Sequence, residues 1–263
     1  MNGGVVKNNS LKRERRFRQF QIEKFDRRRS VPCVSMTVDI DVTRLQERRR
    51  LLNRGVAEGD RISVTHVLVK AAAIALTEFP VLYGLFDGRK VIPSPQIRIN
   101  LPVSEDNHVE YVIVRSPDSK SVQEIATEIR NGAVKIRSGV GEFYQGLKLL
   151  FWMPRCLRKL LTNFMPIGIR LAYNSYGNFP ITNFGSFGVK NGTPVLSSPM
   201  IAVLCCGMIQ LEPLTLKDGG QASKEILPVT LVFDHRPIDG AYGGRFLSRL
   251  KQLMESEVDT IFG

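Results

Sequence analysis

The feature that most constrains the fold is a long, mostly apolar stretch over residues 60–80. Its apolar side chains recur at helical spacing and include Val67, Ala71, Ala72, Ala75 and Phe79. A helix that is apolar on nearly all sides must be buried, and its alanines allow close packing against a neighbouring sheet. The sequence therefore predicts one long, buried helix that packs on a β-sheet.

Strands for that sheet are predicted from short apolar runs and from alternation of apolar with polar side chains. The predicted strands are residues 34–42, 97–103, 109–114, 180–184, 200–208 and 227–233. Glu105, Asp106 and Asn107 form a short polar segment between the second and third of these strands, which predicts a hairpin.

Further helices are predicted from capping residues and helical spacing. Thr43 is expected to cap a helix that stops at Gly55, and Ser121 with Glu124 forms a capping-box pattern. After Gly240 the apolar residues again recur at helical spacing, at Phe246, Leu247, Leu250, Leu253 and Met254. Strands followed by long helices, with no internal repeat, predict one α/β domain built as a sandwich.

The charge of the chain favours acidic or phosphate-bearing partners, because 37 Lys and Arg residues face 25 Asp and Glu residues. Much of this excess lies in residues 1–30, which we expect to form a solvated basic arm. Nucleic-acid binding is the weaker interpretation, since the only aromatic residues among these charges are Phe17, Phe20 and Phe25.

Cysteine and histidine usage argues against a metal site. The four cysteines have no C-x-x-C spacing, and the only histidines are His66, His108 and His235. We therefore expect no zinc site and no structural disulfides. Residues 1–10 contain no apolar segment of the kind found in secretion signals, so a reducing cytoplasm is the expected location.

Residues 143–172 form an apolar, basic stretch that Pro154 and Pro166 interrupt. Crossing a bilayer takes about 20 consecutive mostly apolar residues, so this stretch does not predict a membrane span. We favour a helix packed over the core or over a subunit interface. A basic amphipathic helix on a membrane surface is the alternative.

His235 is the candidate catalytic residue. It ends a predicted strand, a turn containing Pro237 and Gly240 follows, and then a helix begins. Loops after strand ends commonly carry reactive side chains in α/β folds, and histidine suits proton transfer near neutral pH. Taken alone, such a histidine would more often just hydrogen-bond its own turn.

Two motifs favour a catalytic role for His235 over a purely structural one. His235 with Asp239 and Gly240 matches the H-x-x-x-D-G motif of CoA-dependent acyltransferases, and residues 234–247 match the longer form D-H-R-x-x-D-G-A-x-G-x-x-F-L. Residues 181–188 are similar to the pattern I-S/T-N-x-G-x-F-G. On these motifs the chain resembles the catalytic domain of the 2-oxo-acid dehydrogenase (dihydrolipoamide) acyltransferases, which are related to chloramphenicol acetyltransferase.

The resemblance implies a two-layer α/β sandwich with a mixed sheet over residues 31–263, with residues 143–172 as an insertion. It also implies a homotrimer with active sites between subunits. His235 would be the general base that takes a thiol proton, and Thr182 would donate to the oxyanion. Asp239 would brace the histidine loop through an ionic contact with a basic partner.

The resemblance further implies acyl-CoA as substrate and a dihydrolipoyl-like thiol or another small acceptor. Because the sequence shows no lipoyl domain and no Ala/Pro-rich linker, a lipoyl group is expected on a separate protein, and no metal is expected. A non-catalytic trimeric scaffold of the same fold is one alternative. A protein that binds a membrane surface is another.

Overall fold

The computed structural model describes residues 31–105, 108–142, 145, 153–154, 156–157, 177–215 and 221–263. The strands are β1 (Cys33–Asp41), β2 (Leu85–Phe86), β3 (Val91–Ile92), β4 (Arg98–Glu105), β5 (His108–Arg115), β6 (Phe179–Asn183), β7 (Ala202–Cys206), β8 (Gln210–Thr215) and β9 (Gln221–Asp234). The α-helices with assigned bounds are α2 (Thr43–Leu52), α3 (Val64–Glu78), α4 (Val122–Arg137), α8 (Gly240–Glu255) and α9 (Val258–Phe262).

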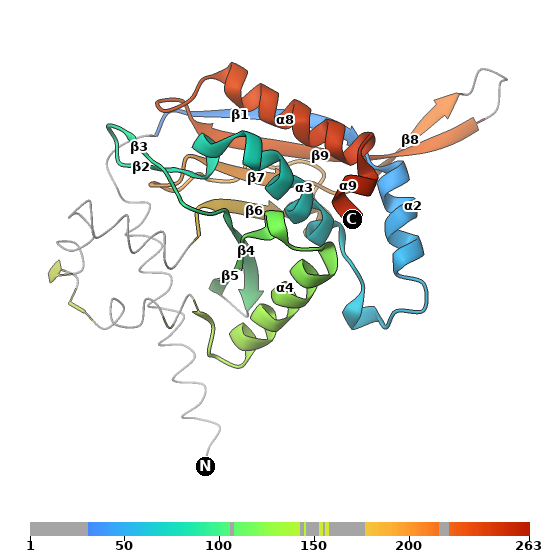
Figure 1. The fold of residues 1–263 in the computed structure, drawn as a ribbon, viewed down its shortest axis with the longest axis horizontal. Coiled ribbons are helices and arrows are strands. Elements are labelled where there is room, and N and C mark those ends of the chain that lie inside the picture. The colour runs from blue at the N-terminus through green and yellow to red at the C-terminus, as the bar shows by residue number, and fades with distance from the viewer. Residues whose placement is uncertain are drawn as a thin grey trace, which may run out of the picture.

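Within these ranges one large sheet has the strand order β1-β9-β7-β6-β4-β5, and β8 pairs with β9 beyond this path. The pairs β4–β6 and β6–β7 are parallel, whereas β1–β9, β7–β9, β8–β9 and β4–β5 are antiparallel. The sheet is therefore mixed. Helices α3, α4 and α8 cover one of its faces, which gives a sandwich of two layers (Figure 1).

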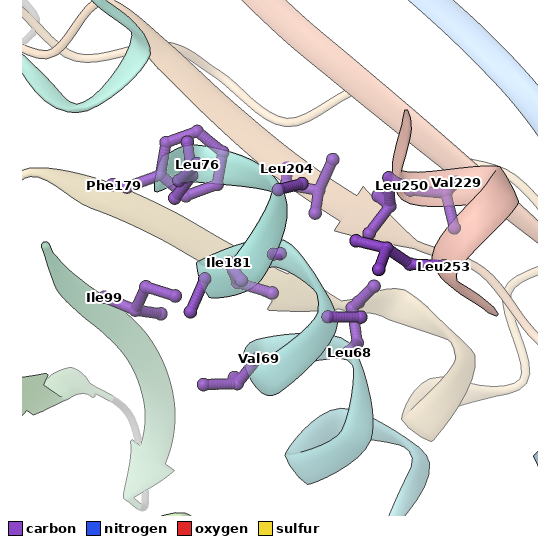
Figure 2. Packing of buried hydrophobic residues seen from close by; sticks show 14 of the residues in the cluster. Leu68, Val69, Leu76, Ile99, Phe179, Ile181, Leu204, Val229, Leu250 and Leu253 are labelled. Atoms are coloured by element: carbon purple, nitrogen blue, oxygen red, sulfur yellow. The ribbon is translucent and has the colours of Figure 1, made fainter. Parts of the chain in front are cut away.

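The core lies between that helix layer and the sheet. Leu68 and Leu76 of α3 are fully buried, as are Ile181 of β6, Leu204 of β7 and Leu250 of α8. Figure 2 shows these side chains meeting between the long helix and the strands. Replacing such a leucine with alanine typically costs about 2–5 kcal/mol of folding free energy, so this helix is central to stability.

The fold class expected from the sequence is confirmed, including the mixed sheet. The predicted hairpin is the pair β4–β5, and Glu105 lies opposite His108. The capping box at α4 is also present, because the backbone N–H of Glu124 donates to Ser121 and the N–H of Ser121 donates to the Glu124 carboxylate.

Two predicted helix starts are wrong. Val42 occupies the N-cap position of α2, and the Thr43 hydroxyl instead donates to Asp41, 2.6 Å away. The long buried helix begins at Val64, because Ser63 accepts a hydrogen bond from the backbone N–H of His66 and caps it there. In both cases the capping residue differs from the one expected, because the Thr43 hydroxyl bonds Asp41 and the cap of the long helix is Ser63.

Most of residues 143–172 lies outside the described residues, so the predicted packing of that stretch stays a prediction. Among the helices of the described residues, none combines the length and apolar character needed to cross a membrane.

Candidate active site

His235 directly follows the last residue of β9, where the chain turns toward α8 (Figure 1). The backbone at the start of the turn is held by hydrogen bonds to the segments on either side of β9. The N–H of Asp234 donates to the carbonyl of Ile201 at 2.9 Å, and the N–H of His235 donates to the carbonyl of Pro32 at 2.8 Å. The histidine therefore starts from a backbone fixed between two neighbouring segments.

The imidazole of His235 is exposed but oriented. Its Nδ1 lies 2.9 Å from the carbonyl oxygen of Ile238. A carbonyl oxygen only accepts hydrogen bonds, so Nδ1 carries the proton in the neutral ring and Nε2 keeps its lone pair. The ring also meets Phe233 edge to face, with centroids 6.1 Å apart. This is the tautomer that a general base acting through Nε2 requires.

Asp234 and Arg236 form an ion pair on either side of His235. The Asp234 carboxylate is buried and accepts from Arg236 Nε at 2.9 Å and from Arg236 Nη2 at 2.5 Å. It also accepts from the backbone N–H of Arg236 at 3.0 Å. Hydrogen bonding to the Asp234 carboxylate raises the pKa of the Arg236 guanidinium, so this cation stays charged.

Asp239 lies at the other end of the same turn and is the N-cap of α8. Its carboxylate accepts a hydrogen bond from the backbone N–H of Tyr242 at 2.8 Å. It forms no ion pair with any residue that the structure describes, and the ion pair at this turn belongs to Asp234 and Arg236. The supporting role assigned to Asp239 stays a prediction.

Thr182 lies near the end of β6 and is half-buried. The next residue, Asn183, donates from its side chain to the hydroxyl of Thr65 at 2.9 Å and accepts from the backbone N–H of Ser186 at 3.2 Å. The end of β6 is thereby anchored to the first turn of α3 and to the 3-10 helix η4 (Phe184–Phe187). Thr182 therefore has a fixed backbone position.

The strand register separates Thr182 from His235 within one chain. Thr182 on β6 lies opposite Cys205 on β7, and Cys205 lies opposite Thr230 on β9. Thr230 precedes His235 by five residues. Five strand residues span about 17 Å and two strand spacings about 10 Å, so the two Cα atoms lie roughly 20 Å apart. The hydroxyl and the imidazole of one chain cannot contact the same thioester.

Neither a metal site nor a reactive buried thiol is evident in the described residues. No group of three or more His, Cys, Asp or Glu side chains there could hold a metal ion. Burial raises the pKa of the Cys205 thiol, opposite Thr182, to about 11, so this sulfur stays protonated near neutral pH. His235 thus remains the candidate base at this site.

A comparison with protein families matches residues 11–142 and 170–262 to the family described as 2-oxoacid dehydrogenases acyltransferase (catalytic domain). The chain belongs to this family. The match begins inside the predicted basic arm and is interrupted over residues 143–169. The division into arm, catalytic domain and insertion stays a prediction.

Two relatives illustrate the similarity in sequence. The chain is 28% identical to the lipoamide acyltransferase component of the branched-chain alpha-keto acid dehydrogenase complex of Bacillus subtilis, covering 86% of this chain and 47% of that protein. It is 31% identical to the dihydrolipoyllysine-residue acetyltransferase component of the pyruvate dehydrogenase complex of Acholeplasma laidlawii, covering 76% of this chain and 32% of that protein. The chain thus spans about half or less of these relatives.

Solved structures agree with this assignment. The dihydrolipoamide acetyltransferase of Azotobacter vinelandii aligns with a TM-score of 0.74 at 25% identity, covering 94% of this chain and 91% of that one. Chloramphenicol acetyltransferase aligns with a TM-score of 0.51 at 14% identity, covering 92% of this chain and 94% of that one, which shows a shared fold.

Sequence reasoning found His235, Thr182 and Asp239, but the structure does not bring all three together in one chain. His235 and Asp239 share the turn before α8, and Thr182 lies across the sheet. The ion pair of Asp234 with Arg236 was not anticipated. Its signal was present, because opposite charges directly flank the histidine in the sequence.

Proposed function

We propose that this chain is a CoA-dependent acyltransferase that moves an acyl group between CoA and a thiol, with His235 as general base. The observation that carries the proposal is the 2.9 Å hydrogen bond between His235 Nδ1 and the Ile238 carbonyl. It leaves the Nε2 lone pair available on an exposed ring at the end of β9. Membership of the acyltransferase family supports the same chemistry.

The reaction needs a proton acceptor because a free thiol, with a pKa of about 8.5, is mostly protonated at neutral pH. His235 Nε2 takes the S–H proton, and the sulfur forms a bond to the carbonyl carbon of the acyl thioester. The carbonyl electron pair moves to oxygen. When the tetrahedral intermediate collapses, the original C–S bond breaks and the departing sulfur takes the proton from the imidazolium.

Thr182 is proposed to stabilise the oxyanion of that intermediate by donating its hydroxyl proton. One such donor contributes about 3–4 kcal/mol in comparable sites. Because Thr182 and His235 of one chain lie roughly 20 Å apart, we propose that Thr182 acts on a substrate held at His235 of a neighbouring copy. A homotrimer with one such site at each boundary fits this requirement.

A dihydrolipoyl thiol on another protein is the proposed acceptor. The relatives are named as lipoamide and dihydrolipoyllysine-residue acyltransferases, which supports this choice. The net charge of +12 suits the phosphates of CoA. No step of the mechanism uses a metal ion. A reducing cytoplasm is the proposed location, where the thiols in this chemistry would stay reduced.

The test is an acyl-transfer assay with purified protein, dihydrolipoamide, and acetyl-CoA or longer and branched acyl-CoAs. Free CoA and acyl-dihydrolipoamide are measured by mass spectrometry. We expect transfer with at least one acyl-CoA, no detectable transfer for His235→Ala, and a fall of about 100-fold for Thr182→Ala. Thr77→Ala is the matched control, because Thr77 is exposed on α3 and its hydroxyl bonds only its own helix.

Two results would contradict the proposal. Wild-type protein that folds but transfers no acyl group across the whole panel would favour the non-catalytic scaffold of the same fold. Equal rates for wild-type protein and His235→Ala would show that the transfer does not depend on this imidazole.

A further inference from the structure

Three residues in a row, Asp234, His235 and Arg236, form a compact unit in which the outer two bind each other. We propose that the Asp234–Arg236 ion pair is a positioning device that holds His235 in the orientation needed for proton transfer. This inference rests on the proposed function and adds two residues to it. Neither residue is proposed to touch the substrate.

The first argument is the shape of the turn. The Asp234 carboxylate accepts the backbone N–H of Arg236, two residues further on. A side chain that bonds the backbone two residues later closes a tight Asx turn and reverses the chain direction. His235 is the central residue of this turn. Its side chain therefore lies on the outside, where it is exposed.

The second argument is the burial of the acid. Asp234 is only 2% exposed, and a buried carboxylate is costly unless it is paired and hydrogen-bonded. Arg236 supplies that pairing through Nε and Nη2, in addition to its backbone N–H. Removing Arg236 would leave the buried Asp234 carboxylate unpaired, and removing Asp234 would take away the acceptor of the turn's backbone N–H, so either change would distort the turn. The geometry around His235 thus depends on both side chains.

The third argument is the contact between Arg236 and an aromatic ring outside the turn. Its guanidinium lies over the ring of Phe86 in β2, 5.0 Å from the ring centroid. The N–H of Phe86 in turn donates to the carbonyl of Pro199 at 2.8 Å. The ion pair therefore connects the histidine turn to two segments outside β9. The attraction between the cation and the face of the aromatic ring favours this position of the guanidinium.

The consequence for His235 follows from its own hydrogen bond. The bond to the Ile238 carbonyl forms only if the turn brings residue 238 back to within 2.9 Å of Nδ1. A displacement of about 1 Å at a catalytic group can lower a rate by about 100-fold. If the turn loosened, the ring would lose the contact that sets its tautomer, and Nε2 would no longer be aimed consistently.

The test uses four variants of the full chain. Asp234→Ala removes the turn bond and the ion pair, Asp234→Asn keeps an oxygen acceptor for the turn but not the charge, and Arg236→Met removes only the guanidinium. Arg249→Met is the matched control, since Arg249 lies on α8 and pairs with Glu78 at the end of α3 and with Glu257 just after α8, rather than at the turn.

The decisive readout is nitrogen-15 NMR of histidine-labelled protein near pH 8, which distinguishes ring tautomers. The chain has three histidines, and His66 supplies an internal reference because its Nδ1 accepts from Ser63 and so carries no proton. We expect wild-type protein and Arg249→Met to show His235 protonated on Nδ1. Asp234→Ala and Arg236→Met should show a mixture of both tautomers, and Asp234→Asn a smaller admixture.

Acyl-transfer kinetics form the second readout. We expect kcat to fall about 10- to 100-fold in Asp234→Ala and Arg236→Met while KM stays within about two-fold of wild type. An unchanged His235 tautomer in both variants would overturn the positioning role. If wild-type protein transfers no acyl group, the proposed function fails, while the NMR comparison still decides the positioning role. If Asp234→Ala does not fold, Asp234→Asn and Arg236→Met carry the same comparison.

Discussion

The side chain of Asn183 donates a hydrogen bond to the hydroxyl of Thr65 across 2.9 Å, joining the end of β6 to the first turn of α3. The two residues are far apart in the sequence, and the bond links the strand that carries Thr182 to the helix that forms the centre of the core. The proposed oxyanion donor therefore has a rigid base.

Removing this link should weaken both stability and catalysis. We expect Asn183→Ala to lower the free energy of unfolding by about 1 kcal/mol, and to lower kcat more than it changes KM. Urea unfolding and steady-state kinetics measure the two effects. Thr65→Val removes the other partner, so the double variant should lose less than the sum of the single variants. Strict additivity would mean that the bond contributes nothing.

The pH dependence of stability should contain a contribution from His66. Burial, and then the nearby positive charge of Arg130, lowers the pKa of His66 from 6.5 to about 4. Between these values the unfolded chain binds more protons than the folded chain, so stability rises with pH through this window. The contribution is complete above about pH 6.5 and is lost as the pH falls toward 4, and it amounts to about 3 kcal/mol.

Urea unfolding at pH 7.5 and pH 5 measures this contribution. His66→Gln is the informative variant, because glutamine can still accept the N–H of Ser63 in the capping box but does not titrate. We expect the variant to lose less stability than wild-type protein on going from pH 7.5 to pH 5. An identical loss in both proteins would exclude His66 as the source.

Two adjacent glycines in α8 should respond in opposite ways to alanine. A Cβ at Gly243 would lie 2.7 Å from the ring of Phe233, whereas a Cβ at Gly244 would meet no atom within 4 Å. We expect Gly243→Ala to destabilise the protein by about 1–3 kcal/mol. Gly244→Ala should stabilise it by up to about 1 kcal/mol. Thermal unfolding of both variants checks this, and a similar effect of both would contradict close packing of α8 on β9.

Variants of Asp239 can separate its role as the N-cap of α8 from any role of its negative charge. Asp239→Ala removes the side-chain acceptor for the N–H of Tyr242 and should cost about 1 kcal/mol. Asp239→Asn keeps an N-cap acceptor and should retain nearly wild-type stability. If Asp239 also acts through its charge, as the family resemblance implies, Asp239→Asn should lose activity at unchanged stability. Full activity of Asp239→Asn would limit Asp239 to the N-cap.

Much of this fold was predictable because its signals are local. The alternation in β1 and β9, the apolar spacing in α3 and α8, and the capping box of α4 each depend on residues close together in the sequence. The start of α3 was misplaced because its cap uses His66, whose side chain acts there through Nδ1 as an acceptor. Glutamate or glutamine usually takes that position.

The site was only partly predictable because its geometry depends on strand register. The residues His235 and Thr182 were recognised from short motifs, but motifs contain no distances. Only the pairing of Thr182 with Cys205, and of Cys205 with Thr230, places the hydroxyl far from the imidazole of the same chain. The role of Arg236 was hidden for a similar reason, since Phe86 reaches it only through the fold.

Subunit complementation tests the central claim most directly. His235→Ala and Thr182→Ala chains are unfolded together in equal amounts, refolded, and assayed for acyl transfer, with each variant refolded alone as control. If His235 of one chain works with Thr182 of its neighbour, about one boundary in four of a random mixed trimer carries both intact residues. We predict about a quarter of wild-type activity from the mixture. Activity no higher than the mean of the two controls would contradict a site shared between chains.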